Sequence, residues 1–352
     1  MSNINNKNRF YELERIAVVV VVVLALIITA LVVFATNDKG RDESDSQQST
    51  PIDGILTGDS GESEQSDYES GGASTESKPV TSNEEILFES ITINNSELNK
   101  GSLVLVNQNY EYTDAGVEGL LVNAYKEKVT NEYLYVLSNT SVMLRADALH
   151  AVGDMLNTFK EDTGLSNLMV SNAYIDKQSQ QSSYDASAGT IDRTELPYLQ
   201  KGGFSEHQTG LAFHLSVYPA SEGEMGEGTH IWFFDNSWKY GFILRYPEGK
   251  ENITQCFADN THFRYVGVPH ASYMYRKNLV LEEYLLDLQS TDHEHRLRLD
   301  VGSADNQYET YAVKAEAGAT TSIMVPAAST GWKYEISGCN NGYFVVTIEK
   351  NN

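Results

Sequence analysis

The sequence predicts a mixed α+β protein, and two kinds of pattern in the 352-residue chain are compatible with this fold class. Residues 145–159 repeat apolar side chains at helical spacing, with Ala148, Val152 and Leu156 on one side. Residues 296–349 instead alternate short apolar runs with turn residues, which is typical of small strands. With 41% hydrophobic residues, the chain can bury a core in one large domain and a smaller one.

An N-terminal membrane anchor is predicted at residues 16–35. These 20 residues are uncharged and mostly apolar, and as a helix they span a hydrocarbon core of about 30 Å. A cleaved signal peptide would have a shorter apolar region and a small-residue cleavage site, so we interpret the run as uncleaved. Basic residues precede it and an acidic stretch follows it, which favours a cytoplasmic tail at residues 1–15. The protein is therefore expected in the cell membrane as a single-pass protein, with its folded part outside the cell.

An acidic linker rich in serine and glycine is predicted at residues 36–84. Residues 37–83 include eleven acidic and three basic residues, and too few apolar ones to offset the entropy cost of folding. We expect a disordered tether that its own charge keeps extended. The formal charge of the whole chain is −24, which argues against nucleic acid as a partner.

A first folded domain is predicted at residues 85–290. Its strand-like segments are residues 102–106, 133–137 and 169–174. A polar stretch at residues 176–193 is expected to form a loop or a loose helix. Further helices are predicted at residues 231–240 and 279–288, and the second of these closes the domain.

A small β-module is predicted at residues 291–352, because the pattern changes there from helical spacing to short strands separated by turn residues. The strand candidates are residues 296–301, 308–315, 320–325, 334–336 and 343–349. The two cysteines, Cys256 and Cys339, are too few for a disulfide scaffold. They either pair, which an oxidising exterior permits, or remain buried free thiols.

Two histidines lie seven residues apart, with Gly210 between them. Residues seven apart on a straight strand point to opposite faces, so His207 and His214 can meet only if the chain turns at the glycine. Neutral imidazole is the commonest protein ligand for metals. The pair alone is compatible with a structural role as well as with metal binding.

Three sequence blocks, in this order, resemble a known family. Residues 205–212 are similar to the SxHxxGxA part of the motif SxHxxGxAxD, residues 239–247 to YGFILRYP, and residues 254–267 to TGYxYEPWHFRYVG. These motifs are those of the VanY-type zinc D-alanyl-D-alanine carboxypeptidases. The resemblance implies an α+β fold in which a small antiparallel sheet carries the metal ligands.

The resemblance also implies a zinc site at His207, His214 and His262, with Asp259 as the catalytic base. His207 and His262 match the family's histidine ligands, whereas His214 replaces an aspartate and Asp259 replaces a glutamate. Three-histidine zinc is an established hydrolytic arrangement, with a bound-water pKa of roughly 7. The shorter Asp259 side chain is expected to lie farther from the metal than a glutamate would.

Substrate contacts are implied by the same resemblance at Ser205, Tyr174 and Gln180. Residues 172–176 are similar to the family segment SGYRS, but Ile175 replaces the arginine that holds the substrate carboxylate in relatives. A charge-assisted hydrogen bond contributes on the order of 1.5–3 kcal/mol, so this replacement should weaken binding of that carboxylate. Arg193 could take over if its loop folds over the site.

Two functions are compatible with these residues. The first is a membrane-anchored, extracellular zinc D,D-carboxypeptidase that acts on peptidoglycan stem peptides with weakened or altered activity. The alternative is a catalytically inactive pseudoenzyme that binds cell-wall peptides or proteins. The family resemblance favours the first function, whereas the changes at one metal ligand, the base and the anchoring arginine favour the second.

Overall fold

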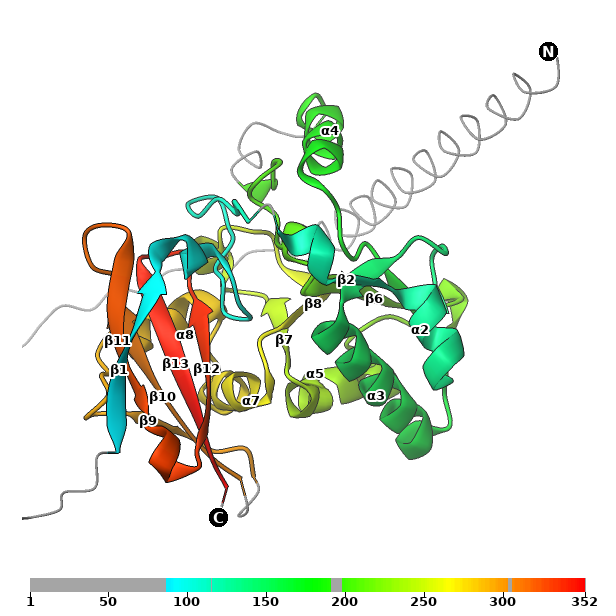
Figure 1. Cartoon of the computed structure of the whole chain (residues 1–352). Coiled ribbons are helices and arrows are strands. Elements are labelled where there is room, and N and C mark those ends of the chain that lie inside the picture. Colours follow the sequence, from blue (N-terminus) through cyan, green and yellow to red (C-terminus); the bar gives the residue numbers. More distant parts are fainter. Residues whose placement is uncertain (1–86, 115, 191–197, 303–305, 352) are drawn as a thin grey trace, which may run out of the picture. The chain divides into compact units, whose positions relative to one another are not determined.

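The computed structural model describes residues 87–114, 116–190, 198–302 and 306–351 (Figure 1). They belong to one compact unit, Val80–Asn352. The predicted cytoplasmic tail, anchor and linker, at residues 1–84, lie outside the described residues. Within the described ranges, no helix has both the length and the apolar character needed to cross a membrane.

A five-stranded sheet with the strand order β3-β5-β6-β8-β7 carries the centre of the fold. Its strands are β3 Val136–Leu137, β5 Leu168–Ser171, β6 Ala212–Val217, β7 Phe242–Tyr246 and β8 Asp259–Tyr265. β3 and β5 pair in parallel, and the other neighbours in the sheet are antiparallel. The fold is therefore mixed α/β with a small and largely antiparallel sheet, as the resemblance implied.

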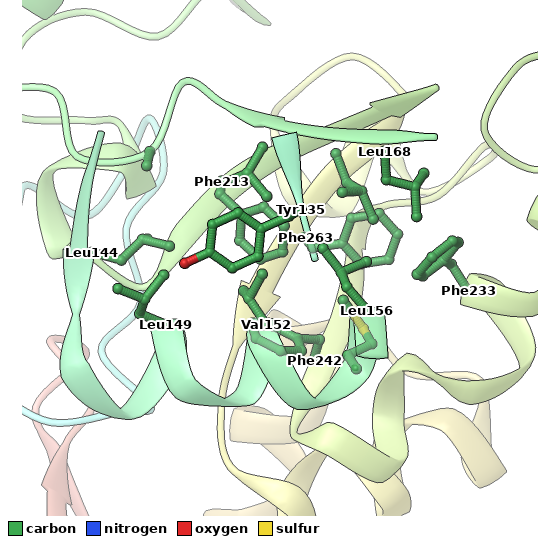
Figure 2. Close-up of a cluster of buried hydrophobic side chains, with 14 of the residues drawn as sticks. Tyr135, Leu144, Leu149, Val152, Leu156, Leu168, Phe213, Phe233, Phe242 and Phe263 are labelled. Atoms are coloured by element: carbon green, nitrogen blue, oxygen red, sulfur yellow. The ribbon is translucent and has the colours of Figure 1, made fainter. Parts of the chain in front are cut away.

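Helix α3, Ala146–Thr163, packs against this sheet and confirms the helix predicted at residues 145–159. Figure 2 shows Leu149, Val152 and Leu156 pointing from the helix toward Phe213 of β6. These side chains are at most 3% exposed, because residues three and four apart share one face of a helix. The helix ends at Gly164, whose left-handed conformation (φ 78°) costs a glycine no steric strain.

Shorter elements surround the sheet and α3. The helices are α2 Ala124–Asn131, α4 Lys177–Ala188, α5 Trp232–Asn236, α6 Glu251–Thr254, α7 Val268–Lys277 and α8 Leu281–Leu288, and β2 Leu121–Asn123 pairs with β4 Met143–Arg145. The 3₁₀ helices are η1 Asn95–Asn99, η2 Val117–Leu120, η4 Glu206–Thr209, η5 Ala220–Glu222, η6 Gly228–Ile231, η7 Ser237–Tyr240 and η8 Ala328–Thr330. Helix α4 lies within the polar stretch predicted as a loop or loose helix.

The strand predicted at residues 102–106 is wrong. Leu103 and Leu105 enter one hydrophobic cluster, whereas Val104 and Val106 enter another. The segment is therefore buried on both sides, and its apolar character reflects this burial rather than membership of a sheet. Its backbone makes isolated hydrogen bonds instead of a continuous strand pairing. For example, Leu105 N donates to the carbonyl oxygen of Cys339 (3.1 Å).

The predicted C-terminal strands are all present. They are β9 Leu297–Leu299, β10 Asn306–Lys314, β11 Thr320–Pro326, β12 Lys333–Gly338 and β13 Tyr343–Asn351. Four of them form a sheet in the order β12-β13-β10-β9, and β11 pairs with β1 Phe88–Asn94. Figure 1 shows β1 (cyan) beside β11 (orange). Residues 88–94, predicted within the first domain, thus lie with the C-terminal strands.

One hydrophobic cluster joins the two predicted folded segments. Leu105, Ile243 and Leu285 pack in the same cluster as Ala312 and Val345. The predicted boundary between residues 290 and 291 therefore crosses a shared core, which explains why the two segments form one compact unit.

Candidate metal centre

A 3₁₀ helix and a tight turn position the first two histidines. His207 lies in η4, which ends at Gly210 in the left-handed conformation (φ 67°). This positive φ favours glycine, and a Cβ atom at position 210 would in addition displace Cδ2 of Leu121, which would lie 2.5 Å away. The chain then enters β6, which carries His214. The turn expected at this glycine is therefore present.

The third histidine comes from the neighbouring strand. His214 on β6 and His262 on β8 are direct partners in the antiparallel pairing. Opposite residues in such a pair project from the same face with Cβ atoms about 4.5–5.5 Å apart, so their rings meet. The ring centroid of His207 lies 5.0 Å from that of His214 and 4.9 Å from that of His262. One nitrogen from each ring lies within 4.8 Å of the others, so the group could hold a metal ion.

The nitrogen geometry and the protonation of the rings fit a metal. Nε2 of His214 lies 3.2 Å from Nδ1 of His262, and two nitrogens bound to one tetrahedral zinc would be about 3.3 Å apart. Burial and the neighbouring His262 lower the pKa of His214 to about 4, and burial lowers the pKa of His207 well below its ordinary value. Both rings are therefore neutral near pH 7, the form in which imidazole binds metals. Nδ1 of His207 is buried without a hydrogen-bond partner.

Asp259 lies beside the three histidines at the start of β8. Its Oδ2 is 3.7 Å from Nε2 of His214, while its Oδ1 accepts hydrogen bonds from the backbone N and the Oγ1 of Thr261 (2.8 and 2.6 Å). Burial raises the pKa of Asp259, whereas His214, His262 and the hydrogen bonds from Thr261 lower it. The lowering effects together are larger, so the pKa of Asp259 is below its ordinary value. One oxygen of an ionised carboxylate thus remains available at the cluster.

The residues predicted to contact substrate lie at different depths. Ser205 is fully buried, and its Oγ has no hydrogen-bond partner. Tyr174 lines a cavity of about 460 Å³, and its hydroxyl donates to Glu118 (3.4 Å). Gln180 lies on α4 and donates its amide to the Gln200 carbonyl (2.8 Å), rather than to any of the three histidines. Their roles toward substrate stay predictions.

Ile175 lies next to the cluster through its backbone. Its N–H donates to the carbonyl oxygen of His207 (3.3 Å), so the segment that resembles the substrate-anchoring motif runs beside a candidate ligand. The apolar side chain cannot hold a carboxylate by charge. Arg193, the predicted replacement, lies outside the described residues.

Sequence reasoning missed a buried charge cluster behind the histidines. Glu206, Arg245 and Arg264 are all fully buried, and Glu206 Oε1 accepts from both arginines at 2.8 Å. Burial raises the pKa of Glu206, but the two arginines more than offset this and keep it ionised. All three lie inside the motifs that carry the resemblance, and Arg245 and Arg264, each flanked by apolar and aromatic residues, were a signal that could have revealed the cluster.

The two cysteines are free thiols in the structure, and both are buried. Cys256 contacts the Gln200 amide (2.9 Å), whereas Cys339 belongs to the hydrophobic cluster shared with α8 and β13. Of the two alternatives that the sequence allowed, the structure shows the unpaired one.

Comparison with known proteins places these features in a family. Residues 141–268 match the family model VanY, described as D-alanyl-D-alanine carboxypeptidase. A D-alanyl-D-alanine carboxypeptidase of Enterococcus faecium is 31% identical over 258 residues, which cover 73% of this chain and 78% of that protein. A D-alanyl-D-alanine carboxypeptidase of Enterococcus faecalis is 41% identical over 85 residues, 24% of this chain and 30% of that protein.

A solved structure shows the same fold over most of the chain. The crystal structure of the vancomycin resistance D,D-dipeptidase VanXYg, in complex with a D-Ala-D-Ala phosphinate analog, has a TM-score of 0.63 and 26% identity. The matched region covers 75% of this chain and 99% of the chain in that crystal structure. The fold and the three-histidine group define a mixed α/β protein with a candidate metal centre on its sheet. The chain belongs to the VanY-type D-alanyl-D-alanine carboxypeptidase family.

Proposed function

We propose that this protein is a zinc-dependent D,D-carboxypeptidase that acts on peptidoglycan stem peptides. The observation that carries the proposal is the convergence of His207, His214 and His262 within 4.8 Å, with the Asp259 carboxylate beside them. Neutral imidazole is a good ligand for zinc. Three protein ligands leave the fourth position of a tetrahedral zinc open for water or substrate. Relatives named as D-alanyl-D-alanine carboxypeptidases support the substrate class.

The residues present have distinct tasks in this reaction. Zinc, when bound, would supply an acidic water and polarise the scissile carbonyl. Asp259 is the candidate general base, because its Oδ2 is the oxygen that faces the histidines while Thr261 orients the carboxylate through Oδ1. A well-placed general base contributes about 10²–10⁴-fold in rate, so the shorter reach of an aspartate is costly.

Substrate anchoring is expected to be the weak step. Ile175 offers no charge to the C-terminal carboxylate of the peptide, although its backbone adjoins His207. We therefore expect slow turnover and a raised KM rather than the absence of a metal site. The extracellular location and the membrane anchor at residues 16–35 belong to this proposal and rest on the sequence.

The alternative is a pseudoenzyme that binds wall peptides or proteins without turnover. The observation in its favour is that one Asp259 oxygen is already engaged by Thr261 while Ile175 stands at the anchoring position. Both the carboxypeptidase and the pseudoenzyme are expected to bind zinc, but only the carboxypeptidase is expected to release D-alanine.

The test is to measure zinc content and D-alanine release from a D-Ala-D-Ala-ended pentapeptide with the purified full-length protein. We expect one zinc per chain and slow release that a chelator abolishes and added zinc restores. Release at background rates with zinc bound would establish the alternative. A chain that takes up no zinc would overturn the metal centre itself. The matched control is His150→Gln, which changes a half-exposed histidine of α3 that is not part of the group.

A further inference from the structure

Two buried polar atoms without hydrogen-bond partners face each other behind the histidine group. They are Oε2 of Glu206 and Nε2 of His262, 3.6 Å apart. Their side chains are 0% and 3% exposed, so water from outside does not solvate them. At 3.6 Å the two atoms are slightly too far apart for a hydrogen bond. Because an unsatisfied buried polar atom is costly, a small approach of the two groups that satisfies both atoms is favoured.

Such a hydrogen bond has only one direction. Two buried guanidinium groups donate to the Glu206 carboxylate, which makes it a hydrogen-bond acceptor, so Nε2 of His262 must supply the hydrogen. In a neutral imidazole the lone pair then lies on Nδ1. Nδ1 is the atom that lies 3.2 Å from Nε2 of His214, on the side of the candidate metal centre. A hydrogen bond to Glu206 would therefore leave the lone pair of His262 on the nitrogen that faces the candidate metal centre.

The carboxylate is held firmly enough for this task. Its other oxygen, Oε1, accepts from Nε of Arg245 and from Nη1 of Arg264. Arg245 is in turn bound by both carboxylate oxygens of Glu282 (2.9 and 2.6 Å). Arg264 donates to the carbonyl oxygens of Ser102 and Val104 (3.0 and 2.8 Å). Each arginine is thus fixed independently, and Glu206 has little freedom to turn away from His262.

We propose that Glu206 is a positioning residue of the metal centre, which selects the tautomer and the orientation of His262. This inference rests on the proposed metal-dependent function, because it assigns a role toward the same ion. In other metalloproteins, losing a partner of this kind lowers metal affinity by about 10–100-fold.

The test compares Glu206→Gln with Glu282→Gln in the full-length protein. Both variants remove a carboxylate from Arg245, but only Glu206 lies against His262. With its oxygen held by the arginines, a glutamine at position 206 would present its NH₂ group to Nε2 and favour the wrong tautomer. In competition with a chelator, we expect zinc affinity to fall about 10–100-fold in Glu206→Gln and to stay close to wild type in Glu282→Gln. An unchanged affinity in Glu206→Gln, or equal losses in both variants, would overturn the proposal.

A second measurement uses the wild-type protein, so it does not depend on whether a Glu206 variant folds. Ring ¹⁵N shifts of the zinc-free wild-type protein report the tautomer of each histidine, and His262→Gln identifies the signals of His262. We expect hydrogen on Nε2, whereas hydrogen on Nδ1 would overturn the role of Glu206. Failure of the wild-type protein to bind zinc would instead overturn the proposed function, while the tautomer would still show whether Glu206 orients His262.

Discussion

Nε2 of His214 lies 3.2 Å from Nδ1 of His262, and the two residues are opposite each other in the pairing of β6 with β8. The sheet register therefore sets the spacing of two of the three candidate ligands, and the turn at Gly210 adds the third. Because the strands hold both rings, little rearrangement is needed to admit an ion. The site should lose affinity when a ligand is removed, rather than adapt.

Removal of His214 should weaken zinc binding more than removal of an outer residue. Loss of a partner that only orients a ligand costs about 10–100-fold in affinity, so His214→Ala is expected to exceed this range. His214→Asp, which restores the aspartate of the motif SxHxxGxAxD, should retain most of the affinity. Chelator competition measures both. Equal affinity of His214→Ala and wild type would show that His214 is not a ligand.

Restoring the family's base should raise activity. Asp259→Glu lengthens the side chain by one methylene and brings its carboxylate closer to the cluster. We expect kcat to rise by up to about 10²-fold, within the range that a general base contributes. D-alanine release under saturating substrate checks this. A lower kcat would mean that the Thr261 contacts have adapted the site to an aspartate.

Restoring the anchoring arginine should act on substrate binding. Ile175→Arg supplies a cation beside His207, and a charge-assisted pair of about 1.5–3 kcal/mol corresponds to about a 10–100-fold gain in kcat/KM. Ile175→Lys is the matched control, because it adds charge without the planar two-donor geometry of arginine. Kinetics on D-Ala-D-Ala-ended peptides separate the two. If neither variant changes kcat/KM, the substrate carboxylate lies elsewhere.

The free energy of unfolding should decrease as the pH is lowered, and His270 is expected to contribute to this loss. This fully buried imidazole contacts Tyr284 Oη (2.7 Å) and Thr347 Oγ1 (3.0 Å), and burial lowers its pKa from 6.5 to about 3. The unfolded chain binds the proton first, so stability is full above about pH 6.5 and is lost as pH falls toward about 3. The slope is up to about 1.4 kcal/mol per pH unit. Urea unfolding between pH 7 and pH 4 should show a shallower loss for His270→Gln than for wild type, and parallel losses would contradict this.

The core beneath the sheet should depend strongly on Phe159. The ring is fully buried and packs against Phe233 (4.6 Å) and Trp232 (5.6 Å). Phe159→Ala should lower the free energy of unfolding by about 3–5 kcal/mol, because it leaves a cavity. Glu161→Ala, on the exposed side of α3, is expected to change it by less than about 0.5 kcal/mol. Chemical denaturation tests both, and similar values for the two variants would exclude tight packing at Phe159.

Local patterns determined much of the fold from the sequence. The helix at residues 145–159 and the C-terminal strands were predictable, because periodicity reports which side of an element is buried. The family motifs likewise located the three histidines and Asp259. The same reasoning failed at residues 102–106, where burial between two clusters imitates the pattern of a strand.

Only the tertiary structure decided how distant residues meet. His214 and His262 are 48 positions apart, and their contact depends on strand register, which sequence spacing does not contain. The pairing of β1 with β11 likewise joins residues 88–94 to residues 320–326, more than 200 positions later in the chain. The sequence by itself determined the kinds of groups available at the site. The structure decided that Glu206 is buried against His262, because burial and hydrogen-bond partners arise only when separate elements pack together.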